Sequence, residues 1–280
     1  MRIALLTTLT MVAFAANSIL NRLALADGEI GPAGFAAMRV AAGCAVLLAL
    51  LALRNRSTPA LARPDPGAVL GLSAYMLGFS FAYVSMDAGV GALVLFGGVQ
   101  ITMFVGALIE GERPPLQRWA GMLLAFLGLT ILSAPSGSVS VPPVAVALMS
   151  IAALGWGVYS LIGRRVADPL QATAGNFLYT LPLVLAALLT WPDAASATGH
   201  GLALAALSGG VTSAMGYALW YALLPSLGAT RGALAQLSAP AIAVCLGVVL
   251  LGEALTWTGL LAGALILGGI VVGLLRWTRA

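Results

Sequence analysis

The sequence predicts an all-α integral membrane protein in which ten transmembrane helices form two inverted five-helix repeats. Composition is the first observation behind this prediction, because 61% of the residues are hydrophobic and only 8% are charged. A typical soluble domain carries about 25% charged residues, so a chain this apolar needs lipid as its solvent. The second observation is a series of long apolar runs, and the third is a similarity between the two halves of the chain.

The apolar runs each approach the roughly 20 residues that a helix needs to cross the hydrocarbon core of a bilayer. Short breaks rich in Gly, Pro and charged residues separate them, as is typical of turns. In chain order the breaks read DGEIGP, RNRSTPALARPDP, DAGV, EGERPP, SAPSGSVSVPP, RRVADP, WPDAASATGH, PSLGAT and GEAL. The predicted spans lie near residues 3–25, 32–53, 67–87, 91–110, 115–133, 143–163, 170–191, 202–224, 230–251 and 255–276.

The arginines predict how these spans are oriented. An even number of spans places both termini on one side of the membrane. If that side is cytoplasmic, eleven of the thirteen arginines lie in inner segments; the two others are Arg22, near the outer end of the first span, and Arg39, within the second. The positive-inside rule therefore predicts that both termini are cytoplasmic. Because the arginines are scattered between apolar blocks, no nucleic-acid-binding surface is expected.

The two halves of the chain are similar at an offset of 141 residues. Gly111-Glu112 then coincides with Gly252-Glu253, and Phe79 coincides with Trp220. Repeated matches at a nearly constant offset indicate an internal duplication, with units at residues 1–137 and 138–280. Five spans is an odd number, so the second unit is expected to be inverted relative to the first. Inverted repeats are typical of transporters that bind substrate near the midplane of the membrane.

The second half resembles an EamA-type member of the drug/metabolite transporter superfamily. The resemblance lies in SLGATRGALAQLSAPAIAVCLGVVLLGEALTWTGLLAGALILGGIVV, residues 226–272, with a proline in the helix, the Gly-Glu pair and a glycine-rich last helix. GALVLFGGVQITMFVGALIEGERPP is the counterpart in the first half, with Val99 in place of Pro240. Within the family, MVAFAANSILNRLAL and GFAAMRVAAG are similar to bacterial aromatic amino acid exporters. The resemblance implies a ten-helix inner-membrane transporter that exports metabolites.

Catalytic and metal-binding functions have little support in the sequence. The single histidine, His200, falls in a predicted outer loop, and no His/Glu spacing suited to a metal ion is present. No nucleophile motif or phosphate-binding loop is found either. We therefore expect no enzymatic activity, no catalytic residue, no metal and no cofactor.

Arg39 is the one charged residue that the sequence places clearly within a span, about two turns from the outer end. Ionisable groups in the hydrocarbon are costly and usually functional. One hypothesis is that Arg39 binds a carboxylate of the substrate. The favoured alternative is a structural ion pair with Asp87, Asp27 or Glu29, which are all predicted near that face. No Asp or Glu is predicted at mid-depth, so no proton-coupling site is evident.

Neutral amides and aromatic rings make up the remaining candidates for a binding site. Neutral amides and rings suit an amphipathic, uncharged or zwitterionic solute, since rings supply contact area and amides and helix ends receive charged groups. The same residues can also be explained as helix packing and interhelical hydrogen bonds. The predicted substrate-binding residues are Asn17, Asn21, Tyr75, Phe79, Gln100, Trp156, Tyr159 and Trp220.

These features predict an exporter of small amphipathic metabolites, with aromatic amino acids as the expected substrates. The expected mechanism is alternating access around a central cavity, and the lipid bilayer is the expected environment; the oligomeric state is left open. A broad-specificity drug or sugar-nucleotide transporter is an alternative, although no central basic cluster for phosphate is evident. A membrane scaffold without transport activity is a second alternative.

The two Gly-Glu pairs are predicted to lie on opposite membrane surfaces and therefore cannot act on one substrate together. In each pair we expect Gly to end one helix and Glu to lie at the positive N-terminus of the next. Two glycine pairs, Gly67/Gly71 and Gly269/Gly273, have the spacing of close helix contacts. For the second pair, packing within the chain is preferred over a dimer face.

Overall fold

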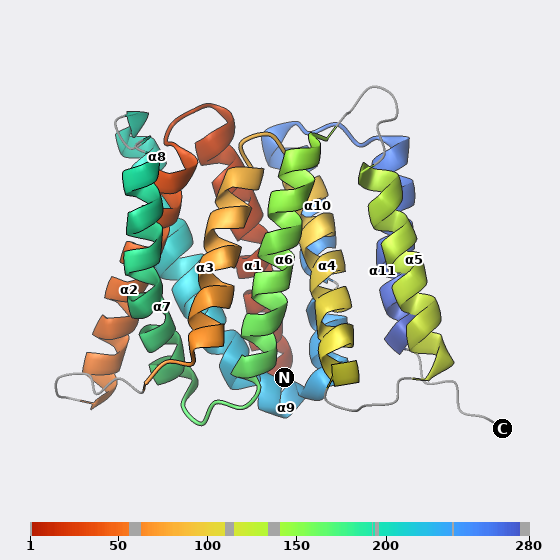
Figure 1. The fold of residues 1–280 in the computed structure, drawn as a ribbon, viewed down its shortest axis with the longest axis horizontal. Helices are drawn as coiled ribbons and strands as arrows, with labels where there is room; N and C mark the ends of the chain where they lie inside the picture. The colour runs from red at the N-terminus through yellow and green to blue at the C-terminus, as the bar shows by residue number, and fades with distance from the viewer. Residues whose placement is uncertain are drawn as a thin grey trace.

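Helices running between two opposite edges make up the fold (Figure 1). The computed structural model describes residues 2–55, 63–109, 115–133, 141–191, 193, 196–236 and 238–274, and all regular structure in these ranges is helical. The helices lie parallel or antiparallel to one another. The first helix begins and the last helix ends at the same edge, the lower one in Figure 1.

The described helices match the ten predicted spans in number when the continuous helical stretch of residues 199–236 is counted as one. Among the described residues, six helical stretches are long and apolar enough to cross a membrane, namely Arg2–Ala26, Pro32–Asn55, Ala88–Gly106, Pro143–Gly163, Pro169–Thr190 and Gly199–Leu227. The four other apolar helices in the described ranges are shorter. The elements are α1 (Arg2–Ala26), α2 (Pro32–Asn55), α3 (Pro66–Ala82), α4 (Ala88–Ile109), α5 (Leu116–Ser133), α6 (Pro143–Gly163), α7 (Pro169–Thr190), α8 (Gly199–Leu207), the π-helix η2 (Ser208–Met215), α9 (Gly216–Gln236), α10 (Ser238–Leu251) and α11 (Trp257–Leu274).

Asp-Pro pairs begin two of the helices on the lower edge. The Asp65 carboxylate accepts hydrogen bonds from the amides of Gly67 and Ala68, at 2.7 and 3.2 Å, and Pro66 follows at the first helical position. Asp168 caps α7 in the same way. An acidic N-cap satisfies amides that have no partner within the helix, and proline fixes a helical φ without losing a needed donor. Helix starts with this local signal match the sequence prediction to within a residue or two.

Helix α4 begins at Ala88, three residues before the predicted start of its span. The reason is Glu253, whose carboxylate accepts hydrogen bonds from the amides of Ala88 and Gly89. Glu253 was expected at the start of the helix that follows it, so this prediction is wrong. It stabilises α4 instead, while Thr256 accepts from the Gly259 amide at 3.0 Å in the first turn of α11. Burial raises the pKa of Glu253, and the two amide donors oppose that rise.

The other expectations for the Gly-Glu pairs have separate outcomes. Gly252 has a φ of +65° directly after α10, which confirms that it ends this helix. The Glu253 amide then donates to the Gly247 carbonyl at 3.2 Å. Gly111 and Glu112 lie outside the described residues.

The eighth and ninth spans differ from the prediction at their junction. PSLGAT was expected to be a turn, but α9 continues through Pro225 and ends at Gln236, so α10 begins at Ser238 rather than near residue 230. A proline removes one helical hydrogen bond. The residues around it are mostly good helix formers, and prolines are tolerated in membrane helices where neighbours compensate. Pro182 likewise lies inside α7.

Glycines allow two pairs of helices to approach very closely. A Cβ on Gly71 would lie 2.8 Å from the Gly155 carbonyl oxygen, and one on Gly155 would lie 2.4 Å from the Gly71 carbonyl oxygen. These glycines therefore set the crossing of α3 and α6. Gly121 of α5 lies against the backbone of Gly269 and Gly273 in α11. This contact confirms the prediction that the Gly269/Gly273 pair packs within the chain.

Carboxylates and arginines fasten the ends of the helices. Near the upper edge Arg22 pairs with Asp87 at 3.5 Å, and Asp193 accepts from the amides of Ala33 and Gly34 at the start of α2. Near the lower edge Arg54, in the last turn of α2, makes two hydrogen bonds of 2.9 and 2.6 Å to Asp168. Helix α2 is therefore bound at both ends to segments from the second half of the chain.

Candidate functional site

The centre of the structure contains a continuous cluster of aromatic rings. Trp156 is at its middle, with its ring 4.6 Å from that of Tyr217 and 5.0 Å from that of Tyr75, measured between centroids. The Phe14 ring joins Trp156 to Trp220, at 5.5 and 5.7 Å. We call this group the aromatic cluster: Phe14 of α1, Tyr75 and Phe79 of α3, Trp156 and Tyr159 of α6, and Tyr217 and Trp220 of α9.

Helical spacing and glycines together place these rings. Tyr75 and Phe79 are one turn apart on α3, and their rings lie 5.1 Å apart. The close crossing of α3 and α6 brings Trp156 against Tyr75. All seven rings are buried, with at most 5% of each side chain exposed. Five of the eight predicted site residues, namely Tyr75, Phe79, Trp156, Tyr159 and Trp220, belong to this cluster.

Arg39 lies directly beside the aromatic cluster and is fully buried, with 0% exposure. Its Nε donates to the Ser213 hydroxyl at 2.8 Å. Its Nη2 donates to the Tyr75 hydroxyl at 3.0 Å and to the Tyr217 hydroxyl at 2.7 Å. The guanidinium carbon is 5.3 Å from the centre of the Tyr75 ring and 5.1 Å from that of Phe79, within cation–π range.

The predicted ion pair of Arg39 is wrong. Within the described residues, its hydrogen bonds go only to the three neutral hydroxyls named above. Asp87 pairs with Arg22, and Glu29 contacts the Thr198 hydroxyl and lies 3.9 Å from His200. The expected acidic partners lie at the surface, whereas Arg39 is the eighth residue of α2, about 10 Å below its start at 1.5 Å per residue. Hydroxyls reach it instead, from helices far along the chain.

The π-helix η2 supplies most of the hydroxyl groups that contact Asn17 and Arg39. The Asn17 side-chain oxygen accepts hydrogen bonds from Ser208 at 2.9 Å, from Thr212, and from Ser213 at 3.2 Å. Ser213 therefore connects Asn17 to Arg39. Short π-helical segments are often found at functional sites.

Gly209 makes the close approach of η2 to α2 possible. A Cβ at this position would lie only 2.0 Å from the carbonyl oxygen of Arg39. The contact brings the hydroxyl-bearing residues of η2 to the level of the guanidinium. The same contact thus positions the backbone of η2 and the Arg39 side chain relative to each other.

The two predicted asparagines differ in their surroundings. Asn17 contacts η2, as described above. Asn21, one turn along α1, donates to the Asn17 carbonyl at 2.8 Å, and its side-chain oxygen accepts from Ser80 of α3 at 3.4 Å. Asn21 thus connects α1 to α3, which fits the alternative that some amides serve helix packing.

Gln100 is a predicted site residue that no hydrogen bond or ring contact joins to the aromatic cluster within the described residues. It lies on α4, and the Nε2 of its half-buried side chain has no hydrogen-bond partner. Neighbouring positions on α4 face α6, since a Cβ on Gly98 would lie 2.7 Å from Ala153. Its role in substrate binding stays a prediction.

Several buried nitrogen donors near the centre have no acceptor among the described residues. They are Nη1 of Arg39, Nδ2 of Asn17 and the indole Nε1 atoms of Trp156 and Trp220. Buried donors are usually hydrogen-bonded. The structure therefore combines an arginine without a carboxylate partner with other buried nitrogen donors that lack an acceptor.

Sequence reasoning missed four polar residues of this region, which are Ser208, Thr212, Ser213 and Tyr217. A signal was present, because SGGVTSAMGY is a run of small and hydroxyl-bearing residues inside an otherwise apolar span. Membrane helices use such residues for close contacts and for hydrogen bonds between helices. Only the fold shows that they converge on Arg39 and Asn17.

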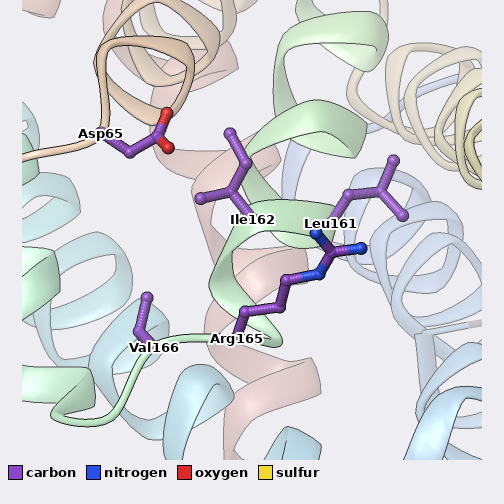
Figure 2. Close-up of a pocket in the computed structure, with 5 residues that line it drawn as sticks. All are labelled: Asp65, Leu161, Ile162, Arg165 and Val166. Atoms are coloured by element: carbon purple, nitrogen blue, oxygen red, sulfur yellow. The ribbon is translucent and has the colours of Figure 1, made fainter.

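A separate cavity of about 310 Å³ lies toward the lower edge (Figure 2). Asp65 from the start of α3 and Arg165, just after α6, contribute its charged side chains, with Leu161, Ile162 and Val166 around them. None of these residues belongs to the aromatic cluster. Within the described ranges, no group of three or more His, Cys, Asp or Glu side chains is arranged to hold a metal ion.

Comparison with known protein families identifies the chain. The model of the EamA-like transporter family matches twice, at residues 1–134 and 143–275. The chain belongs to the EamA-like transporter family. It is thus a membrane transporter, in agreement with its apolar helices.

Individual relatives of this EamA-like transporter match two thirds or more of the chain. An uncharacterized protein of Pseudomonas aeruginosa is 45% identical over 273 residues, covering 97% of this chain and 94% of that protein. A probable amino-acid metabolite efflux pump of Salmonella typhimurium is 27% identical over 203 residues, covering 67% of each chain. A solved crystal structure matches with a TM-score of 0.65 at 26% identity, covering 95% of this chain and 98% of the other.

Proposed function

We propose that this EamA-like transporter exports small amphipathic metabolites, with aromatic amino acids as its substrates. The observation that carries the proposal is the aromatic cluster, which lies where helices of both halves meet and is continuous with the buried charge of Arg39. Rings of the protein supply stacking surface for a ring of the solute. The printed name of the Salmonella relative, an amino-acid metabolite efflux pump, points to the same class of solute.

The proposed mechanism is alternating access between two inverted repeats of five spans each, residues 1–137 and 138–280. Two separate matches to one family model support this division. The helix contacts support it as well, since α2 packs on α7, α4 on α10 and α5 on α11, each pair joining corresponding helices of the two halves. Sites between such halves are exposed to each side in turn.

Opening of the site requires the rings to separate. In this structure the rings of the aromatic cluster pack on one another, with several centroid distances between 4.6 and 5.8 Å. A solute therefore enters by taking the place of ring–ring contacts. Residues on α1, α3, α6 and α9 then line the opened space, and they include Tyr75, Phe79, Trp156 and Trp220.

The proposed location is the inner membrane, with both termini in the cytoplasm. The distribution of arginines supports this orientation, because Arg54 lies in the last turn of α2, Arg164 and Arg165 follow α6, and both helices end at the edge where α1 begins. Arg22, the clear exception, is held at the opposite edge by Asp87. Charges at that inner edge follow the positive-inside rule.

Uptake of labelled phenylalanine into proteoliposomes that contain the purified chain tests the proposal. We expect saturable uptake that unlabelled aromatic amino acids inhibit more strongly than other amino acids, cationic drugs or sugar nucleotides. Stronger inhibition by drugs or sugar nucleotides would favour the broad-specificity alternative. The absence of uptake of any amphipathic solute would contradict a carrier function and favour a scaffold.

A further inference from the structure

We propose that Arg39 binds the carboxylate of the transported solute and that the site recognises this carboxylate but not the α-ammonium group. The preferred substrates are then aromatic monocarboxylates, and aromatic amino acids are accepted because they share the ring and the carboxylate. This inference rests on the proposed function, because it describes the same site. It adds which part of the solute is recognised.

The first argument is the incomplete compensation of the Arg39 charge. A buried ion costs several kcal/mol unless an opposite charge or good hydrogen bonds compensate for it. Arg39 has three neutral hydroxyl acceptors and two adjacent ring faces, while its Nη1 has no acceptor in the described structure. A carboxylate would supply both the missing acceptor and the opposite charge.

The second argument is the set of buried nitrogen atoms that are left without an acceptor at Arg39 and in the neighbouring helices. The unpaired atoms of Arg39, Asn17, Trp156 and Trp220 are all N–H donors. Asn17 has no spare capacity as an acceptor, because three hydroxyls already donate to its oxygen. An ionised carboxylate only accepts hydrogen bonds, at about four positions. The chemistry of the leftover atoms therefore matches an anion.

The third argument concerns the ammonium group of an amino acid. An ammonium group carries three donors and no acceptor, and the hydroxyls and ring faces nearest to Arg39 are already engaged by the guanidinium. None of the described helices contains Asp or Glu. Asp87 and Glu253 are engaged at the upper edge, by Arg22 and by the start of α4. An ammonium group near Arg39 would also be repelled by the like charge.

The aromatic cluster completes the recognition of the solute. The Tyr75 and Phe79 rings lie beside the guanidinium, and the Tyr75 ring leads to Trp156. A ligand whose carboxylate binds Arg39 has its ring within reach of these side chains. Charge and ring are therefore recognised by adjacent parts of one site.

Three matched ligands separate the two groups of the amino acid. Phenylpropionate is phenylalanine without the amine, and phenethylamine is phenylalanine without the carboxylate. Competition against labelled phenylalanine, bound to the purified full chain in detergent, measures the affinity of each. We expect phenylpropionate to bind at least as tightly as phenylalanine. We expect phenethylamine to bind about 10- to 100-fold more weakly, as for the loss of a hydrogen-bonded charge.

Variants locate the effect at Arg39. Arg39→Gln should weaken phenylpropionate binding about 10- to 100-fold, while binding of the uncharged analogue phenylpropanol changes little. Arg39→Lys keeps the charge without the planar fork and should give an intermediate affinity. Arg22→Gln is the matched control, because that arginine lies at the upper edge and is paired with Asp87; it should leave all four affinities unchanged.

The outcomes distinguish this inference from the proposed function. If phenylalanine binds and phenethylamine binds equally well, the exporter proposal stands and the carboxylate inference is overturned. Unchanged phenylpropionate binding by Arg39→Gln overturns the inference in the same way. If no aromatic solute binds or is taken up, both are overturned. The ligand series on the unaltered chain decides the matter even if an Arg39 variant does not fold.

Discussion

Arg39 and Tyr217 are joined by a 2.7 Å hydrogen bond from the guanidinium Nη2 to the phenolic oxygen. The two residues are 178 positions apart in sequence and come from different halves of the chain. The bond therefore ties a charge on α2 to an aromatic ring on α9. Under the proposed alternating access the two halves move relative to each other, so this contact would join the site to the moving parts.

Replacing Tyr217 with Phe removes the hydroxyl and keeps the ring. We expect the KM for phenylalanine uptake to rise about three- to tenfold, in line with a hydrogen bond worth roughly 1 kcal/mol. Tyr221→Phe is the matched control, because that hydroxyl bonds to the Tyr159 carbonyl at 2.9 Å and not to Arg39. An equal rise in both variants would show that the Arg39 contact has no special role.

Replacing rings of the aromatic cluster with smaller apolar side chains should lower the uptake of aromatic solutes. Phe79→Leu and Trp220→Leu remove stacking surface while keeping an apolar side chain, which limits the loss of stability expected of alanine variants. We expect uptake of phenylalanine to fall several-fold with the protein still monodisperse in detergent. Trp257→Leu, at a side chain that is 86% exposed, is the control; uptake unchanged in all three variants would remove these rings from the site.

Gly209→Ala tests the close approach of η2 to α2. Its methyl group would meet the Arg39 carbonyl oxygen at 2.0 Å, so the helices must move apart. Overpacking of this kind typically costs about 1–3 kcal/mol, and we expect a lower midpoint of thermal unfolding in detergent. Gly199→Ala, where nothing lies within 4 Å of the added atom, should unfold as the unaltered protein does. Equal midpoints for both variants would contradict the packing.

The ion pair of Arg54 and Asp168 predicts a pH dependence of stability. The hydrogen bonds from Arg54 hold the pKa of Asp168 below its usual range. The pair therefore stabilises the fold above the unfolded pKa of Asp, near 4, and this contribution is lost as pH falls through the lowered value. Because both side chains are partly exposed, solvent screens the pair and keeps this contribution small.

Thermal unfolding of Asp168→Asn measures this contribution. We expect a lower midpoint than that of the unaltered protein at pH near 7, and a difference that shrinks in acid. Asp168→Asn combined with Arg54→Gln should cost little more than either change alone. A difference between Asp168→Asn and the unaltered protein that persists at all pH values would instead reflect the cap on α7.

Uptake should not depend on an imposed proton gradient. Carriers coupled to protons commonly use buried carboxylates or histidines, and none of the described helices contains Asp or Glu. His200 is in the first turn of α8, with its side chain 64% exposed. Phenylalanine uptake with and without a pH difference across the vesicle membrane checks this expectation. Marked acceleration by the gradient would reveal a proton site that the described helices lack.

Local chemistry made much of the fold predictable from the sequence. Apolar runs predicted the helices, and Asp65 and Asp168, each followed by proline, marked two helix starts closely. The start of α4 was not predictable in this way, because its capping carboxylate belongs to Glu253, which is 165 positions away from Ala88. The continuation of α9 through Pro225 likewise depends on the surroundings of the helix rather than on its own residues.

The candidate site was also predictable only in part, because contacts within one helix can be derived from the sequence and contacts between distant segments cannot. Tyr75 and Phe79 share a face of α3 because they are one turn apart, so the sequence predicted that part of the aromatic cluster. The partners of Arg39 could not be derived, since Ser213 and Tyr217 reach it from 174 and 178 residues away. Choosing the acidic residues predicted near the same membrane face led to the wrong ion pair, because depth in the membrane separates them from Arg39.

The carboxylates of Asp193 and Glu253 also bear on how the protein is made. They cap α2 and α4, which emerge from the ribosome well before them. Until the segments that carry Asp193 and Glu253 are translated, the first amides of these two early helices lack their carboxylate acceptors. A chain that stops after Leu251 would therefore lose more than its final helix, since α4 would also lose the group that fixes its start. The start of α4 thus becomes complete only near the end of synthesis.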